Sequence, residues 1–258
     1  MPRPGLVGII ANPAAGRDIR RLVAHGRVVP NQEKSNTLRR VLLGLDAVGV
    51  ERVLLMPDRY SLARQALDGL PLSLDAQLLD MWLKDAEDDS VRAATTMREA
   101  GAGCLVVLGG DGTSRAVAKA CGDVPLVSIS TGTNNVFPVM VEGTVAGLAV
   151  GLVARGLVPL ESVSASSKRL EVYLDGVLHD LALVDVAVAA GRMVGAGAIW
   201  DIEAVSELFL TRAQVGAIGL SSIGALVQPI SASEDSGLHV TLGPGGVRVL
   251  APVAPGVV

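Results

Sequence analysis

Along the first half of the chain, short apolar runs alternate with longer segments in which apolar residues recur every three or four positions. A short run that is apolar throughout is typical of a strand buried on both faces of a parallel sheet. Leu38, Leu42 and Leu45 have the spacing of an amphipathic helix, which Gly49 can end. Asp75–Leu83 fits either a strand or a turn of helix. We predict strands at Leu6–Ala11, Glu51–Met56, Cys104–Leu108 and Leu126–Ser130, and helices at Gln32–Gly49, Asp58–Leu70, Asp85–Ala100 and Asp111–Cys121.

The second half is richer in alternating patterns. Arg169–Asp175 alternates apolar and polar residues as a half-buried strand does, and Gly176 can turn the chain. We predict further strands within Val177–Ala189, helices at Gly143–Arg155 and Asp201–Arg212, and a hairpin of His239–Leu242 with Val247–Leu250. We therefore expect an α/β chain: a Rossmann-like, parallel-sheet nucleotide-binding domain at 1–142 and a β-rich, substrate-side domain at 143–258.

Three polar segments rich in glycine and asparagine follow predicted strands, after Ala11, Leu108 and Ser130. Strands that alternate with helices form parallel sheets, which bind ligands at the carboxyl ends of their strands. The three segments should therefore meet at one edge of the sheet and form one site.

Composition narrows the classes of partner. The formal net charge is −4 and no block of Lys or Arg stands out, so we expect no nucleic-acid partner. The longest uncharged stretch, Ala213–Ser233, contains two glutamines, a proline and several serines, and we read it as a buried helix or loop rather than a membrane span. The N-terminus lacks the pattern of a signal peptide, and Cys104 and Cys121 have no metal-ligand spacing. We expect a cytoplasmic homo-oligomer.

The sharpest chemical signal is the pentapeptide Gly109–Thr113, of sequence GGDGT. Glycines allow close approach of a ligand and positive φ, and the following helix N-terminus offers N–H groups to phosphate. Asp111 would repel phosphate, so it suits a sugar hydroxyl or a magnesium-bound water. The structural alternative is that Asp111 caps the helix beside glycines of a tight turn.

These segments resemble the NAD kinase/diacylglycerol kinase superfamily. GGDGT after an apolar strand is its hallmark, Asn12–Arg17 (NPAAGR) resembles its first turn, and Thr131–Asn135 (TGTNN) resembles its Gly-Thr-Asn loop. Finer features, including Met56-Pro57-Asp58 and TGTNNVFP, are similar to the acetoin-catabolism protein X branch, which is ATP-NAD kinase-like. The resemblance covers essentially the whole chain.

The resemblance implies an NAD kinase-like fold, ATP and Mg²⁺ as cofactors, and transfer of phosphate to a hydroxyl of NAD or a related nucleotide or small polyol. It implies catalytic roles for Asp111 and Asp185, and assigns no residue as a direct metal ligand. It implies nucleotide binding by Asn12, Pro13, Gly16, Arg17, Gly109, Gly110, Gly112, Thr113, Thr131, Gly132, Thr133, Asn134 and Asn135.

Two departures keep a second function open. NAD kinases carry an Ala-Leu-Asn-Glu/Asp motif, and here Val184 replaces the asparagine before Asp185. Related proteins also carry a late Asp-Gly-Glu segment, which this sequence lacks, so the second domain can be C-terminally shortened and without its catalytic base. The alternative is therefore a non-catalytic nucleotide-binding regulator linked to acetoin metabolism. A lipid kinase ranks last, because no basic patch for a membrane is present.

Other charged side chains are weaker candidates for the site. Asp185 alone fits a strand-end carboxylate in solvent, and Asn134-Asn135 alone fits a turn. Arg17 and its neighbours Arg20 and Arg21 fit either a phosphate clamp or a solvated helix face. Lys34 fits the same two interpretations.

Overall fold

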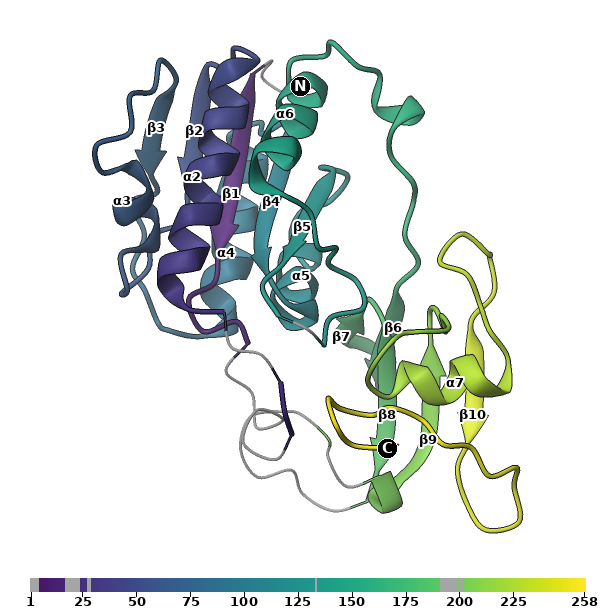
Figure 1. Cartoon of the computed structure of the whole chain (residues 1–258). Coiled ribbons are helices and arrows are strands. Elements are labelled where there is room, and N and C mark those ends of the chain that lie inside the picture. The colour runs from purple at the N-terminus through teal and green to yellow at the C-terminus, as the bar shows by residue number, and fades with distance from the viewer. Residues whose placement is uncertain (1–4, 17–23, 27–28, 133, 191–198, 200–201) are drawn as a thin grey trace. The chain divides into compact units, whose positions relative to one another are not determined.

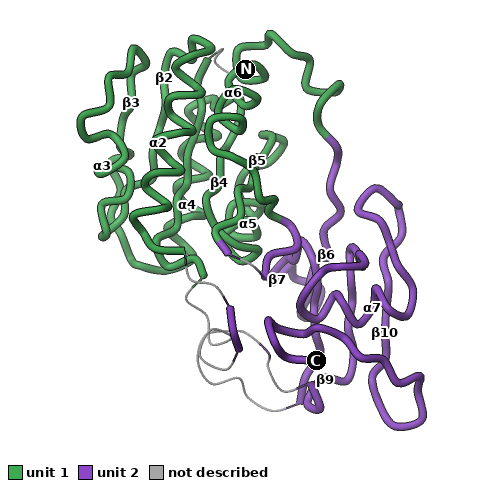
Figure 2. Tube along the Cα trace, viewed as in Figure 1, with its two compact units in different colours: residues 1–16, 29–131, 138–164 green, residues 17–28, 132–137, 165–258 purple. Residues whose placement is uncertain are grey.

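A computed structural model describes residues 5–16, 24–26, 29–132, 134–190, 199 and 202–258 of the 258-residue chain. The described residues form two compact units (Figure 2). The first contains residues up to 16, 29–131 and 138–164, and the second contains the described parts of 17–28, residues 132–137 and those from 165 onward. The units thus divide the chain after residue 164 rather than at 142, because the helix Gly143–Ala154 packs in the first unit.

The first unit is a five-stranded parallel sheet with helices on both faces, as the sequence pattern predicts (Figure 1). Its strands, in the order β3-β2-β1-β4-β5, are β1 (Leu6–Ala11), β2 (Arg52–Leu55), β3 (Asp75–Leu78), β4 (Cys104–Gly109) and β5 (Leu126–Ser130). Its helices are α2 (Asn31–Ala47), α3 (Leu62–Leu67), α4 (Glu87–Glu99), α5 (Asp111–Ala118) and α6 (Gly143–Ala154). The ambiguous segment after Asp75 is a strand, and the helix expected at Asp58–Leu70 is confined to α3.

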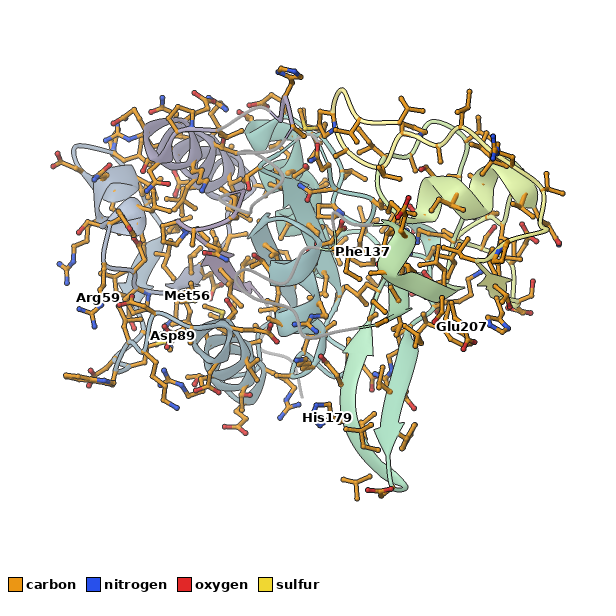
Figure 3. The ribbon with its side chains drawn as sticks, turned by 90° about the horizontal axis from the view of Figure 1, so that it is seen from below. Met56, Arg59, Asp89, Phe137, His179 and Glu207 are labelled. Carbon is orange, nitrogen blue, oxygen red and sulfur yellow. The ribbon has the colours of Figure 1, made fainter. Side chains whose placement is uncertain are left out.

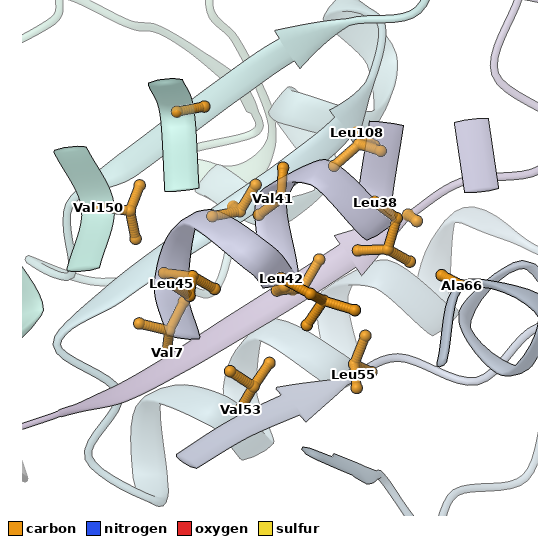
Figure 4. Packing of buried hydrophobic residues seen from close by; sticks show 14 of the residues in the cluster. Val7, Leu38, Val41, Leu42, Leu45, Val53, Leu55, Ala66, Leu108 and Val150 are labelled. Carbon is orange, nitrogen blue, oxygen red and sulfur yellow. The ribbon is translucent and has the colours of Figure 1, made fainter. Parts of the chain in front are cut away.

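Each face of this sheet has its own hydrophobic cluster. All residues of β1 and β4 are buried, so odd and even positions face opposite layers of helices. Val7 and Ile9 pack with Leu38, Leu42 and Leu45 of α2 (Figure 4), whereas Leu6 and Ile10 pack with Met97 of α4. This two-sided burial explains why β1 and β4 show no alternation in the sequence.

Helices α2 and α6 cover the face of the sheet to which Val7 and Ile9 point. The two helices approach each other closely, because glycines line their contact. A Cβ at Gly147 would lie 2.3 Å from Val41 O, and one at Gly44 would lie 2.5 Å from Thr144 O. The two backbones can meet at this spacing only without side chains at these positions. The glycines at 44 and 147 therefore set how α2 and α6 cover the sheet.

The second unit is antiparallel. A two-stranded hairpin joins β6 (Leu170–Leu174) to β7 (Val177–Ala182), and a three-stranded sheet has the order β10-β9-β8. The latter comprises β8 (Asp185–Ala189), β9 (Val205–Leu210) and β10 (Leu238–Thr241), with α7 (Ser221–Val227) packed in the same cluster of buried residues. On β9 and β10, the ring of His239 stacks on Phe209, and its Nε2 forms a hydrogen bond of 2.8 Å with Glu207, which Figure 3 labels.

Two predictions in this unit are wrong. The helix expected at Asp201–Arg212 is, over its described residues, a 3-10 turn (Ile202–Ala204) followed by β9. The hairpin expected with Val247–Leu250 does not form: β10 pairs with β9, and residues 247–250 are irregular backbone with exposed ends. The stretch Ala213–Ser233 holds the short helix α7, and in the described part of the chain no helix is long and apolar enough to span a membrane.

Candidate functional site

The candidate site begins where the two central strands of the first sheet end. β1 and β4 are neighbours, and Ala11 lies opposite Leu108 in their register. After β1 the chain continues to β2 on one side, and after β4 it continues to β5 on the other. Ligands of α/β proteins bind at the carboxyl ends of strands at such a switch point. The turn predicted at Asn12–Arg17, which is described up to Gly16, and the loop Gly109–Thr113 both start here.

Asn12 joins the two loops. Its N–H donates to Leu108 O (3.0 Å), and its side-chain Nδ2 donates to Thr113 Oγ1 (2.9 Å). Its Oδ1 accepts from Ala14 N–H (2.9 Å), which closes the turn that follows the strand. The amide expected to contact a nucleotide therefore bonds at both ends to the protein, and Asn12 holds the first turn against the glycine-rich loop.

The glycine-rich loop differs from expectation in its backbone. β4 ends at Gly109, Gly110 is the N-cap of α5 in an extended conformation, and Asp111 is the first residue of the helix. Asp111 is therefore not the N-cap, and the capping alternative for it is wrong. Gly109, Gly110 and Gly112 do not need positive φ either, whereas Gly16 of the first turn has φ 77°.

The three glycines have different roles in packing. A Cβ at Gly109 would lie 2.6 Å from Thr113 Cβ, so this glycine makes room for the threonine that Asn12 holds. A Cβ at Gly112 would meet nothing within 4 Å, which leaves open space beside the first turn of α5. Gly110 is the N-cap but has no side chain, so it gives no side-chain hydrogen bond to the first N–H groups of α5.

The start of α5 suits an anion. The first N–H groups of a helix have no partner within the helix, and the dipole makes this end positive. Asp111, half-buried, places one carboxylate beside these groups. A phosphate held by backbone N–H groups, with a carboxylate next to it for a hydroxyl or a hydrated cation, is the chemistry that this arrangement supports.

Thr131 extends the site to the end of β5. Its N–H donates to Gly109 O (3.1 Å), and its side chain is 5% exposed. Within the described part of the chain its buried Oγ1 has no hydrogen-bond partner. A buried hydroxyl without a partner is unfavourable by about 1–3 kcal/mol, so a polar ligand atom here would be stabilised.

The structure therefore brings Asn12, Pro13 and Gly16 together with Gly109–Thr113 and Thr131. The remaining residues of the third loop, Gly132, Asn134 and Asn135, belong to the second unit. Thr133 and Arg17 lie outside the described residues, as do Arg20 and Arg21.

Lys34 is a residue that the sequence suggested only weakly. It lies in the first turn of α2, is 2% exposed, and donates from Nζ to the carbonyl oxygens of Pro13 (2.8 Å), Ala15 (2.9 Å) and Asn12 (3.3 Å). It thus holds the first turn from behind rather than facing solvent. Its only sequence signal is a lysine close to the start of a helix that follows the turn.

In the second unit, Asp185 begins β8 directly after two buried residues. Val184, at the position where NAD kinases have asparagine, is buried, and its C=O accepts from Thr211 N–H (2.9 Å) and Oγ1 (3.2 Å). Its side chain offers no hydrogen bond to a ligand.

Arg212 of the second unit is a buried polar residue that the sequence analysis did not identify. It is buried, its guanidinium lies 5.2 Å from the Phe137 ring centroid (Figure 3 labels Phe137), and Nη2 donates to Ser167 Oγ (2.7 Å). It therefore holds Phe137 and Ser167 together within its own unit. A single arginine after a strand is too common to be a signal.

Neither cysteine has the properties of a nucleophile. Cys104 and Cys121 are buried thiols outside any disulfide, and burial raises the pKa of Cys104 to about 11. Among the described residues there is no group of three or more His, Cys, Asp or Glu side chains that could hold a metal ion.

Comparisons with known proteins agree with this geometry. Residues 7–157 match the ATP-NAD kinase N-terminal domain, and residues 168–258 match the Acetoin catabolism protein X C-terminal domain. The chain is 42% identical to the "Acetoin catabolism protein X" of Cupriavidus necator over 268 aligned positions, which cover 97% of this chain and 74% of that protein. The two matched segments are separated at residues 158–167, where the compact units also divide.

Proposed function

The chain belongs to the acetoin catabolism protein X family with an NAD kinase-like N-terminal domain, and on that premise we propose that it is an ATP-dependent phosphotransferase. The acceptor would be a hydroxyl of NAD or of a related nucleotide or small polyol. The observation that supports this best is the pair of loops at the β1–β4 switch point, which the Asn12–Thr113 hydrogen bond holds together.

The residues present fit the phosphates of ATP. The α5 N-terminus with its glycine cap and the open space at Gly112 suit a phosphate, and Gly16 gives the first turn a shape that other residues rarely adopt. Mg²⁺ is usually held by one or two carboxylates together with substrate phosphates, and Asp111 supplies one carboxylate. When bound, Mg²⁺ neutralises charge on the transferred phosphate.

In this proposal the protein's own groups mainly position the reactants. Backbone N–H groups of α5 hold the phosphates, and the Thr131 hydroxyl gains the partner that it lacks among the described residues. Asp111 or Asp185 orients the acceptor hydroxyl or takes its proton. We extend the proposal to a cytoplasmic homo-oligomer that acts on small molecules.

One observation favours a second candidate, a nucleotide-binding regulator without turnover that is linked to acetoin metabolism. Val184 is buried, and it cannot hydrogen-bond an adenine edge as the asparagine of NAD kinases would. The phosphate-binding loops support both candidates equally. Assays of ATP hydrolysis and of phosphate transfer to a panel of acceptors separate them.

Nucleotide binding is tested first. At a concentration of ATP about 100-fold above Kd, linkage raises the free energy of unfolding by roughly 2.7 kcal/mol, a visible shift in Tm. Gly112→Val should keep the fold, because its side chain enters open space, and should abolish the shift by filling the phosphate position. Gly243→Val, also in open space, is the control. A flat thermal shift for wild type across adenine nucleotides with Mg²⁺ would end this proposal.

Asp111→Asn tests the chemistry. Asparagine keeps the shape of the side chain, so the variant should fold, and its affinity for ATP should change less than its turnover, because backbone N–H groups hold the phosphates. Turnover should fall by about 10²–10⁴-fold if Asp111 acts as a base. Normal turnover in this variant would exclude the role, and a wild type that binds ATP but transfers no phosphate would favour the regulator.

A further inference from the structure

We infer that Lys34 is a positioning residue for the nucleotide phosphates, which it serves by holding the first turn without touching the ligand. The inference rests on the proposed function, since it names what prepares that same site. Its basis is the buried ammonium of Lys34, which bonds to the carbonyl oxygens of Asn12, Pro13 and Ala15. A lysine immobilised in this way stabilises one conformation of the turn.

The direction of these carbonyl groups decides what the turn presents to a ligand. In a trans peptide the N–H points opposite to the C=O, and the structure has no cis peptide bonds in its described part. Lys34 attracts the Pro13 and Ala15 carbonyl oxygens to one side, so the N–H groups of Ala14 and Gly16 point to the other. Without the ammonium, these oxygens would be free to rotate toward the ligand and repel phosphate.

The N–H side of the turn is the side nearer α5. Ala14 N–H donates to Asn12 Oδ1, and Asn12 Nδ2 donates to Thr113 in the first turn of α5. The turn therefore has Lys34 behind it and the helix N-terminus in front. The Gly16 N–H is directed away from Lys34 and adds to the donors that α5 offers to an anion.

The glycine at the end of the turn supports the same role. Gly16 has φ 77°, a left-handed conformation that residues with a side chain rarely adopt. Glycine adopts this conformation without strain, so the turn depends on other contacts to select it. Lys34 bonds to the carbonyl of Ala15, directly before Gly16, and so fixes the peptide group that matters most.

The test compares Lys34→Met with Lys119→Met, which removes the same charge from the same unit at the far end of α5. Binding of ATP and of inorganic tripolyphosphate is measured by calorimetry, and amide hydrogen exchange is followed at Asn12 and at residues 14–16. Lys34→Met should weaken both ligands by about 10- to 100-fold, since small misplacements of binding groups have effects of this size. It should also speed exchange in the turn, whereas Lys119→Met should do neither.

A merely structural lysine would lower Tm but leave the affinity of the folded protein unchanged. Wild-type affinity for tripolyphosphate in Lys34→Met would therefore overturn the inference while the proposed function stands. If Lys34→Met does not fold, Lys34→Arg serves instead: it keeps the charge but cannot place one nitrogen on three carbonyls. A smaller loss in the same direction is expected, and wild-type affinity and exchange would overturn the inference. Absence of binding in wild type shows instead that the proposed function has failed, and this inference fails with it.

Discussion

The two units bury their strands in different ways, and the difference explains what each can support. In the first unit, every residue of β1 and β4 is buried between two layers of helices. In the second, β6 is exposed at three of five positions, and one hydrophobic cluster serves the sheet and α7 together. Strands covered on both faces cannot shift without disturbing two clusters, so their ends are well-placed supports for a ligand site.

The placement of polar groups follows the same contrast. In the first unit, Asn12, Lys34 and Thr131 are tied by hydrogen bonds to loops at the ends of buried strands. In the second, Arg212 contacts Phe137 and Ser167. In the first unit, these polar residues are therefore held together at one edge of the sheet. In the second unit, the hydrogen bond and ring contact of Arg212 are separate from such an edge. Variants that affect one unit but not the other test this comparison.

The largest expected effects on the free energy of unfolding come from truncating a buried leucine in the core of each unit. Leu42 of α2 and Leu208 of β9 are both fully buried, and replacing either with alanine should lower the free energy of unfolding by about 2–5 kcal/mol. Leu43, next along α2 and 41% exposed, is the control, with an effect within about 0.5 kcal/mol.

Urea unfolding followed by probes in each unit measures the result. If the units are separate folding units, Leu42→Ala should shift only the transition of the first and Leu208→Ala only that of the second. One shared transition that moves equally in both variants would show that the two regions fold as one, and the contrast drawn above would lose its energetic basis.

An intermediate effect is expected where α2 meets α6. Gly147→Ala places a Cβ 2.3 Å from Val41 O, a backbone atom that can move only with its helix. Overpacking of this kind destabilises by about 1–3 kcal/mol, against a gain of up to about 1 kcal/mol from the helix propensity of alanine. Gly243→Ala, in open space in the second unit, is the control. An unchanged unfolding midpoint for Gly147→Ala would contradict the close packing of these helices.

The smallest expected effect concerns pH and the start of α6. At Glu142, partial desolvation acts to raise the pKa, but hydrogen bonds from Val145 and Thr144 N–H and the charge of Arg40 outweigh it and lower the pKa below its ordinary 4.5. A carboxylate with a lowered pKa stabilises the folded state above the ordinary value, and this contribution is lost as pH falls through the folded pKa.

Glu142→Gln should therefore lower Tm slightly at neutral pH, and the difference from wild type should shrink as the pH falls below the ordinary 4.5. Melting curves from pH 3 to pH 7 measure it. Glu161, exposed in a 3-10 turn of the same unit, is the control position for glutamine substitution. A difference in Tm that stays constant over this range would show that the ionised carboxylate is not what caps α6.

The helix predicted at Asp201–Arg212 shows why the spacing of apolar residues did not reveal β9. Val205 and Leu208 are both buried and three residues apart, which is a helical spacing. A register shift between β8 and β9 lets Ala189 pair with Val205 while Val188 pairs with Glu207, so Ser206 is an extra residue. This bulge changes the phase of the strand and puts both apolar residues on the buried side. The bulge is recognised only from the pairing with β8, because the sequence of β9 alone does not specify its register with the neighbouring strand.

The sequence by itself determined the parallel sheet, its strand ends and the identity of the GGDGT loop, because these depend on local runs of apolar residues and on glycines at their ends. Tertiary structure alone decided which polar groups bond to each other. Asn12 and Thr113 are 101 positions apart, and Lys34 meets the first turn across 19 to 22 positions. Local spacing cannot report contacts between distant segments. A buried lysine and a solvent-facing one therefore looked alike until α2 was packed behind the turn.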